Sequence, residues 1–221
     1  MLPPILRDIP EEFETERLLI RAPRAGDGPE VCRAIRESLA ELRPWMLWAS
    51  EDPQESLVEE NLRRARIGFL ERSDLRLLVF LKGTETLVAS SGLHNIVWEI
   101  PSFDVGYWCR TPFSGRGYVT EAVRGITAFA FELLEARRVS IRCDADNHRS
   151  RAVAERVGFR HEGTLRQSEL GVDGLPADTH YFSLLPHEYR SLGLRQSLRA
   201  VGPAGWEEPG APGGKTPGQP L

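Results

Sequence analysis

The chain has 221 residues, of which 41% are hydrophobic and 27% are charged, and its formal net charge at pH 7 is −4. This length supports one sizeable hydrophobic core, and the mild acidity argues against a protein that is held mainly by nucleic-acid phosphates. The sequence has no run of about 18 apolar residues, so we expect no membrane-spanning helix.

The N-terminus and the cysteines indicate a reduced, cytoplasmic protein. Met1-Leu2-Pro3-Pro4 lacks the basic segment and the apolar core of a secretory signal. Cys32, Cys109 and Cys143 are odd in number and widely spaced, so they match neither a disulfide framework nor a metal-ligand pattern. We therefore expect cytoplasmic localisation and no bound metal.

In the first half of the chain, hydrophobic spacing predicts two helices set between short strands. The predicted elements are a strand over 15–21, a helix over 29–42 capped by Asp27, a helix from Pro53 to about Glu71, and strands over 75–81 and 87–96. Gly92 lies inside the last strand and predicts a bulge or a close approach of another group.

The second half alternates strands with helices. The predicted elements are a strand over 103–110, a helix that ends near Glu135, a strand over 138–143, a short helix over 150–157, an extended segment over 159–170, a turn over 171–174, a strand over 179–185, and a helix from Pro186 to Ala200. Strands joined by short turns should pair antiparallel, whereas the strand–helix–strand crossover should be parallel.

This order predicts a single α/β domain over residues 1–200, with a mixed, twisted sheet and helices on both faces. Residues 201–221 are rich in proline and glycine and show no periodicity, so we expect a disordered tail there.

A glycine turn between the strand over 103–110 and the following helix is the strongest local signal. Gly115 and Gly117 can adopt positive φ and let another group approach the backbone closely. The N–H groups at the start of the helix have no partner within the helix and favour an anion, so the turn predicts a phosphate site. An ordinary strand-to-helix turn explains the same residues equally well. Thr120 stands where a dinucleotide-binding turn needs a third glycine, and the Gly-Lys-Ser/Thr of a Walker loop is absent.

Several motifs in the right order together resemble the GNAT superfamily of N-acetyltransferases, and within it the RimJ/RimL-like, ribosomal-protein-alanine N-acetyltransferase type. The resemblance covers about residues 13–185. The motifs are Thr15-Glu16-Arg17-Leu18, Trp45-Met46-Leu47-Trp48, Gly106-Tyr107-Trp108, the turn over 114–122, Asn147-His148-Arg149-Ser150, Gly158-Phe159 and Glu162-Gly163.

The resemblance implies acetyl-CoA as the cofactor. Ser114 and Val119 depart from the usual first and last residues of the family's phosphate-binding turn, and Val119 is expected to weaken binding at most, because the backbone forms the cradle. The residues expected to bind the cofactor are Cys109, Arg110, Ser114, Gly115, Arg116, Gly117, Tyr118, Val119, Thr120 and Asn147.

The resemblance also implies that the amine attacks acetyl-CoA directly. It places Ser150 beside the leaving sulfur and Glu169 as the general base, with Asp104 as the rival base. From the residues alone, Ser150 equally fits the first turn of a helix, whereas Glu169 fits a solvated edge strand better than a catalytic base. Because histidine in general titrates near neutrality, His94 and His180 stay open as weaker candidates.

Trp45 and Trp48 fit either core positions or the wall of a substrate cleft. The expected reaction is acetyl transfer to a primary amine, with the α-amine of a protein or peptide N-terminus as the leading acceptor. A small amine (polyamine, amino acid or aminoglycoside) and a non-catalytic acyl-CoA-binding protein are the alternatives. No nucleic-acid or membrane partner is expected, and a homodimer stays open.

Overall fold

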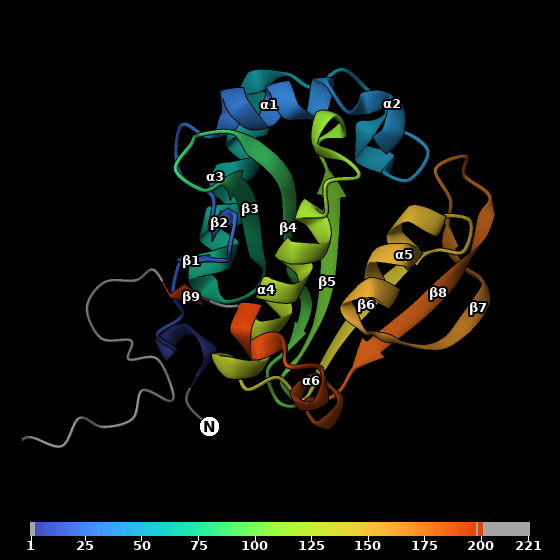
Figure 1. Ribbon diagram of the computed structural model, residues 1–221. Helices are drawn as coiled ribbons and strands as arrows, with labels where there is room; N and C mark the ends of the chain where they lie inside the picture. Colours follow the sequence, from blue (N-terminus) through green and yellow to red (C-terminus); the bar gives the residue numbers. More distant parts are fainter. Residues whose placement is uncertain (1–2, 198, 201–221) are drawn as a thin grey trace, which may run out of the picture.

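A computed structural model gives the fold and describes residues 3–197 and 199–200 (Figure 1). Its strands are β1 (Glu12–Glu14), β2 (Leu18–Arg21), β3 (Leu75–Leu81), β4 (Leu87–Val97), β5 (Ser102–Cys109), β6 (Arg138–Asp144), β7 (Arg160–Leu170), β8 (Pro176–Leu184) and β9 (Arg199–Ala200). Its helices are α1 (Gly28–Arg36), α2 (Leu39–Leu42), α3 (Glu55–Glu71), α4 (Tyr118–Glu132), α5 (His148–Val157) and α6 (Pro186–Leu192), with short 3₁₀ turns at Pro4–Leu6, Leu47–Ala49, Thr111–Phe113 and Leu194–Ser197.

The strands form one mixed sheet in the order β7-β8-β6-β5-β4-β3-β2-β1-β9. β5 and β6 pair parallel, as expected for a strand–helix–strand crossover, and the other neighbouring pairs are antiparallel. The prediction of a single α/β domain with a mixed sheet is confirmed.

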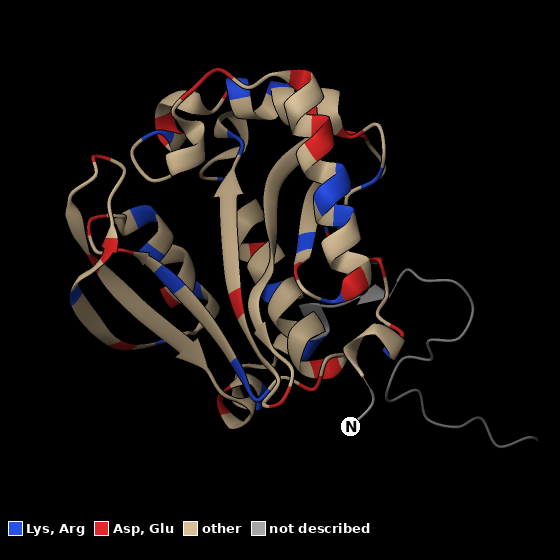
Figure 2. Ribbon diagram, turned by 180° about the vertical axis from the view of Figure 1, so that it is seen from behind, with Lys and Arg blue, Asp and Glu red and all other residues tan. Residues whose placement is uncertain are grey.

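Apolar side chains on both faces of the sheet hold the helices in place. On β3, Leu77 and Val79 belong to the larger core with α4 and α5, whereas Leu78 and Phe80 belong to a second core with α1 and α3. This alternation follows from the two-residue period of a strand. Figures 1 and 2 show α4 and α5 over one face and α3 over the other.

The parallel pairing of β5 and β6 is short. Ser102–Asp104 pair with Arg138–Ser140, and no pair follows. Beyond this point β5 continues along β4 to Cys109, while β6 continues along β8 to Asp144. The two strands therefore diverge and leave one edge of β5 without a neighbouring strand (Figure 1).

The helix predicted over 29–42 is wrong as a single helix. It is interrupted between α1 and α2, where the Ser38 hydroxyl donates to the Ala34 carbonyl at 2.7 Å and accepts the Thr111 N–H at 3.0 Å. Serine that bonds back to a carbonyl competes with the helix, so a contact distant in sequence decides the break. Asp27 is the N-cap residue of α1 as predicted, but its carboxylate makes no cap hydrogen bond, because both of its oxygens bind the Arg21 guanidinium instead.

Other boundaries differ by small amounts. β1 was not expected, and β8 begins at Pro176 rather than 179. The predicted helix from Pro186 to Ala200 stops at Leu192, because Gly193 adopts φ +65°. Gly92 does mark a close approach, since a Cβ there would lie 2.8 Å from the Leu75 carbonyl oxygen. The expected disorder of residues 201–221 lies outside the described residues. Over the described ranges, no helix is both long and apolar enough to cross a membrane.

Arg110 was expected to bind the cofactor, but its side chain is buried against Glu30 and Glu37. Its side chain is only 8% exposed, and it donates to both Glu37 oxygens at 2.8 and 2.9 Å and to Glu30 at 2.9 Å. Hydrogen bonding to Arg110 lowers the pKa of Glu37 below its ordinary value, against a smaller opposing effect of burial. Arg110 therefore joins the end of β5 to α1.

Replacing Arg110 with Met would leave two carboxylates without their cation. We expect the free energy of unfolding to fall by about 3 kcal/mol, near the low end for a buried pair because Glu37 meets solvent. In a domain of this size that loss lowers the melting temperature by roughly 6–12 °C, which calorimetry measures. Arg64→Gln is the matched control, since its pair with Glu60 is exposed at both ends and should change melting by less than about 2 °C. Equal melting temperatures for the two variants would contradict the role given to Arg110.

Candidate active site

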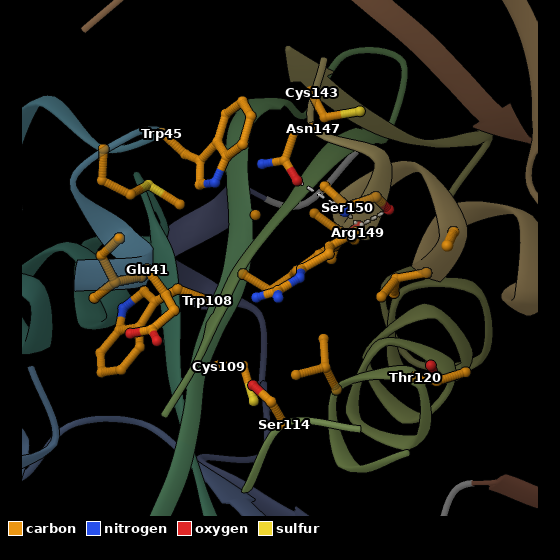
Figure 3. A pocket seen from close by; sticks show the side chains of 18 of the residues that line it. Glu41, Trp45, Trp108, Cys109, Ser114, Thr120, Cys143, Asn147, Arg149 and Ser150 are labelled. Carbon is orange, nitrogen blue, oxygen red and sulfur yellow. Dashed lines mark hydrogen bonds between the residues drawn. The ribbon is translucent and has the colours of Figure 1, made fainter. Parts of the chain in front are cut away.

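A cleft of about 1830 Å³ opens where β5 and β6 diverge (Figure 3). Its walls include Val105 and Tyr107 from one face of β5, and Gly106 and Trp108 from the other. Because adjacent residues of a strand point to opposite faces, the cleft reaches both sides of the sheet. The start of α4 and the side of α5 line one end, whereas residues 44–48 and the end of β7 line the other.

The glycine turn has the backbone geometry that its sequence predicts. Gly115 and Gly117 adopt φ +75° and +80°, and Gly117 is the N-cap of α4 without a side-chain cap. The first N–H groups of α4 therefore lack an acceptor within the helix. A Cβ on Gly115 would meet no atom within 4 Å, so the space over the turn is open. This is an anion cradle of backbone donors.

Arg17, from the turn before β2, braces this cradle. Its Nη1 donates to the Arg116 carbonyl at 3.2 Å, and its guanidinium lies over the Tyr118 ring at 4.5 Å. Its Nε and backbone N–H both donate to Glu121, at 2.6 and 2.8 Å, and Thr15 Oγ1 donates to the same carboxylate at 2.6 Å. The first strands of the chain thus fix the start of α4.

Glu121 is held ionised by these donors. Burial alone would raise its pKa, but the hydrogen bonds from Thr15 and Arg17 lower the pKa below its ordinary value. A lowered folded-state pKa stabilises the fold above the unfolded pKa, and this contribution is lost as the pH falls through the folded value. The brace is therefore fully formed at neutral pH.

Tyr107 joins β5 to the first turn of α5. Its hydroxyl donates to the Ser150 carbonyl at 2.9 Å and accepts the Ser150 Oγ–H at 3.1 Å. Burial raises the pKa of Tyr107, so the phenol is neutral. Asn147 Oδ1 accepts the Ser150 N–H at 3.0 Å and caps α5. These contacts fix Ser150 on the cleft wall, in the first turn of α5 (Figure 3).

The two cysteines in the cleft are poor nucleophiles. Burial raises the pKa of the Cys109 and Cys143 thiols. The hydrogen bonds to Ser114 and Ser150 act in the opposite direction, but their effect on the pKa is smaller. A thiol that stays protonated reacts slowly, since the thiolate is the nucleophile. The thiols therefore do not favour a covalent acyl-cysteine route.

Arg142 connects the two candidate bases. Its Nη1 donates to Glu169 at 2.6 Å, and its Nε donates to Asp104 at 3.1 Å. Glu169 and Arg142 line the cleft, but Asp104 does not. Asp104 also accepts from Asn95 at 2.9 Å. Geometry therefore favours Glu169 over Asp104.

The end of the cleft opposite α4 carries exposed apolar side chains. Trp45 and Trp48 are 37% and 51% exposed and line the cleft, so neither is a core residue. Trp48 lies against Trp108, with ring centroids 6.1 Å apart. Leu170 and Val172 line the same end from β7 and the turn that follows it.

Comparison with known proteins identifies the fold and its chemistry. A model of the acetyltransferase (GNAT) domain matches residues 17–160. The chain belongs to the GNAT acetyltransferase family. Its enzymes transfer the acetyl group of acetyl-CoA to an amine, and acetyl-CoA is the cosubstrate of this chain.

Relatives in this family share most of the chain. YdaF of Bacillus subtilis, named as a candidate ribosomal N-acetyltransferase, is 31% identical over 178 residues, which cover 79% of this chain and 94% of its own. The ribosomal-protein-serine acetyltransferase of Escherichia coli is 26% identical over 140 residues, 62% of this chain and 78% of its own. A solved structure of RimL, an L7/L12 α-N-protein acetyltransferase in complex with coenzyme A, has the same fold, with a TM-score of 0.72 at 20% identity over 77% of this chain and 95% of that one.

The residues present fit acetyl-CoA. A backbone cradle suits a diphosphate, and the unpaired edge of β5 offers N–H and C=O groups to the amides of a pantetheine arm. Of the expected cofactor residues, only Arg110 and Arg116 do not line the cleft. The Arg116 guanidinium lies over the Phe113 ring instead, at 5.6 Å. Those that line it are Cys109, Ser114, Gly115, Gly117, Tyr118, Val119, Thr120 and Asn147.

The structure also shows which candidates lie elsewhere. His94 is bound to Asp74 at 2.6 Å, and His180 is buried beside Thr164 at 2.7 Å, so neither lines the cleft. Sequence reasoning missed the positions of Tyr107, Arg142 and the Arg17 brace. Arg17 stood in a recognised motif, but its partner Glu121 lies 104 residues away, and no local pattern indicates the pair.

Replacing Gly117 with Val tests the cradle. A β-branched residue is strained at φ +80°, and its Cβ would lie 3.5 Å from Arg17 Nη2, so the substitution disturbs both the turn and the arginine that holds it. We expect CoA affinity to fall by at least about tenfold, as for the loss of one or more charge-assisted hydrogen bonds, in isothermal titration calorimetry. Gly83→Val is the control, because Gly83 has φ +75°, open surroundings and a place outside the cleft. Unchanged affinity in a folded Gly117→Val protein would remove the cradle from this account.

Proposed function

We propose that the protein acetylates the α-amine of a protein or peptide N-terminus by direct attack on acetyl-CoA. The observation that carries the proposal is that Ser150 and Glu169 line one cleft, which crosses the sheet from the cradle side to the side of the exposed tryptophans. The names of the relatives, which refer to ribosomal proteins, support a protein acceptor.

In this proposal the cradle at the start of α4 binds the diphosphate, and the free edge of β5 beside Cys109 orients the pantetheine arm. Acetyl-CoA supplies the activated acetyl group as a thioester. The amine nitrogen forms a bond to the acetyl carbon, the bond from that carbon to sulfur breaks, and the sulfur leaves as a thiolate. A free thiol has a pKa of about 8.5, so the thiolate needs only modest stabilisation at neutral pH.

Ser150 is proposed to donate a hydrogen bond to the leaving sulfur. Its hydroxyl is held at 3.1 Å from Tyr107 Oη, and the Asn147 cap fixes its backbone. Its single O–H proton points to Tyr107 Oη in the structure, so the hydroxyl turns toward the sulfur when CoA binds, and a donor held beside developing charge then lowers the barrier. Tyr107 acts here as a positioning residue through Ser150.

Glu169 is proposed to collect the proton of the amine, directly or through a water. Its side chain is 45% exposed, so the proton can pass on to solvent. An α-amine has a pKa of about 7.7–8.0 and a lysine amine about 10.4, so about one α-amine in ten is uncharged at pH 7 against fewer than about one lysine amine in a thousand. The free-energy cost of removing the proton at pH 7 is therefore smaller for the α-amine. A single carboxylate is matched to this smaller cost, which favours the α-amine.

Trp45 and Trp48, with Leu170 and Val172, are proposed to hold the first residues of the acceptor peptide. Flat apolar walls of this kind bind side chains without demanding one sequence. Their position opposite the cradle brings the acceptor in from the other face of the sheet.

Glu169→Gln tests the base. The substitution keeps the size of the side chain and removes its basicity, so turnover at pH 7 should fall by about 10²–10⁴-fold with CoA affinity nearly intact. The loss should shrink as the pH rises above about 8, because the amine then arrives uncharged. Mass detection of the acetylated peptide gives the rate, and calorimetry gives the affinity.

Asp104→Asn is the matched control, since each single variant leaves Arg142 one carboxylate partner. If Glu169→Gln keeps near-normal turnover and Asp104→Asn does not, the base is Asp104. If lysine side chains of N-terminally blocked peptides are acetylated as fast as peptide α-amines, the acceptor assignment is wrong.

A further inference from the structure

Beyond the cradle, the faces of α4 and α5 continue the cleft and end in arginines. On α4, Gly117, Thr120 and Arg124 follow one another at helical spacing and all line the cleft. On α5, Arg149, Val153 and Arg156 do the same. Arg124, midway along α4, and Arg156, in the last turn of α5, thus stand together where the cleft ends between the two helices.

The two arginines are held close to each other. Arg124 Nη2 donates to the Arg156 carbonyl at 2.9 Å. Arg124 Nε is buried and has no hydrogen-bond partner within residues 3–197, and in the same part of the chain the Arg156 side chain forms no hydrogen bond or ion pair. The exposed Arg156 guanidinium therefore stays available as a donor at this end of the cleft, beside the positive charge of Arg124.

Nearby carboxylates do not neutralise this end. Glu121 is taken by Thr15 and Arg17, and Glu155 pairs with Arg151 at 2.8 Å outside the cleft. Arg124 lies six positions after Tyr118, which is about 9 Å along a helix. The cleft thus offers two separate anion sites, the backbone cradle and an arginine pair.

We infer that Arg124 and Arg156 form a subsite for the 3′-phosphate of CoA, distinct from the cradle for the diphosphate. The inference rests on the proposed use of the cradle. CoA carries its diphosphate and its 3′-phosphate on opposite sides of one ribose, so a ligand that runs from the cradle along α4 places the second anion toward the arginines. A phosphate monoester with about two negative charges fits two guanidinium groups.

The arginine pair has a consequence for selectivity. It binds a group that 3′-dephospho-CoA lacks, so the protein discriminates between CoA and this precursor-like analogue. The cradle binds the diphosphate that both ligands carry, so it contributes equally to both affinities.

Isothermal titration calorimetry with CoA and with 3′-dephospho-CoA tests the subsite. The full chain should bind CoA roughly tenfold more tightly, as expected for charge-assisted hydrogen bonds in a partly exposed site. Arg156→Gln should reduce this ratio to about two or less, with the loss confined to CoA. Arg124→Gln should do the same, and Arg124→Lys should recover part of the ratio because it keeps the charge.

Arg151→Gln is the matched control, since Arg151 lies on α5 outside the cleft and should leave the ratio unchanged. Arg156 is exposed and has no side-chain partner among the described residues, so its variant should fold and melt as the parent chain does. Equal affinities of the parent chain for the two ligands, or an unchanged ratio in both Arg156→Gln and Arg124→Gln, would overturn the inference. Failure to bind either ligand would instead contradict the proposed function itself.

Discussion

The divergence of β5 from β6, fixed by the Tyr107–Ser150 contact, is the constraint on which the site depends. Three residue pairs hold the strands together, and beyond Asp104 and Ser140 they follow different neighbours. Tyr107 then joins β5 to α5 through its hydrogen bonds with Ser150, at 2.9 and 3.1 Å. Because the phenol is neutral, this bridge persists over the pH range in which an α-amine titrates. Without the gap the sheet would be continuous, and no ligand could reach from one face to the other.

In the proposed mechanism the gap lets each reactant use a different face. The cradle and the faces of α4 and α5 lie on one side. Trp48 packs on Trp108 of the second core on the other side, and Glu169 binds Arg142, which alternates along β6 with Ile141 and Cys143 of the larger core. The two sides of the sheet are also connected through residues 110–111, just ahead of the glycine turn. Arg110 binds Glu37, and Thr111 binds Ser38 and Glu41. The segment that carries Trp45 follows directly from α2. A frame of buried charge and hydrogen bonds therefore fixes the segment that carries Trp45 relative to the glycine turn.

Local patterns in the sequence predicted most strands and helices, the parallel crossover and the positive φ at Gly115 and Gly117. What they missed are contacts between residues far apart in the chain. Asp27 has an ideal cap position but binds Arg21, Ser38 breaks a regular helical pattern through Thr111, and Arg110 turns away from the cleft toward α1. In each case a buried or partly buried charge or hydroxyl found a stronger partner than the local one. The resemblance placed Ser150 and Glu169, but it did not indicate Arg142 between Glu169 and Asp104.

Amide hydrogen exchange, with and without saturating CoA, tests most directly whether the gap is the cofactor site. The account predicts that the amides of residues 105–109 on the free edge of β5, and those of 118–121 at the start of α4, exchange more slowly when CoA is bound. Amides of β2 and β3, which are paired on both sides, should not change. Saturating binding that leaves residues 105–109 and 118–121 unprotected, or that protects a different surface, would contradict it.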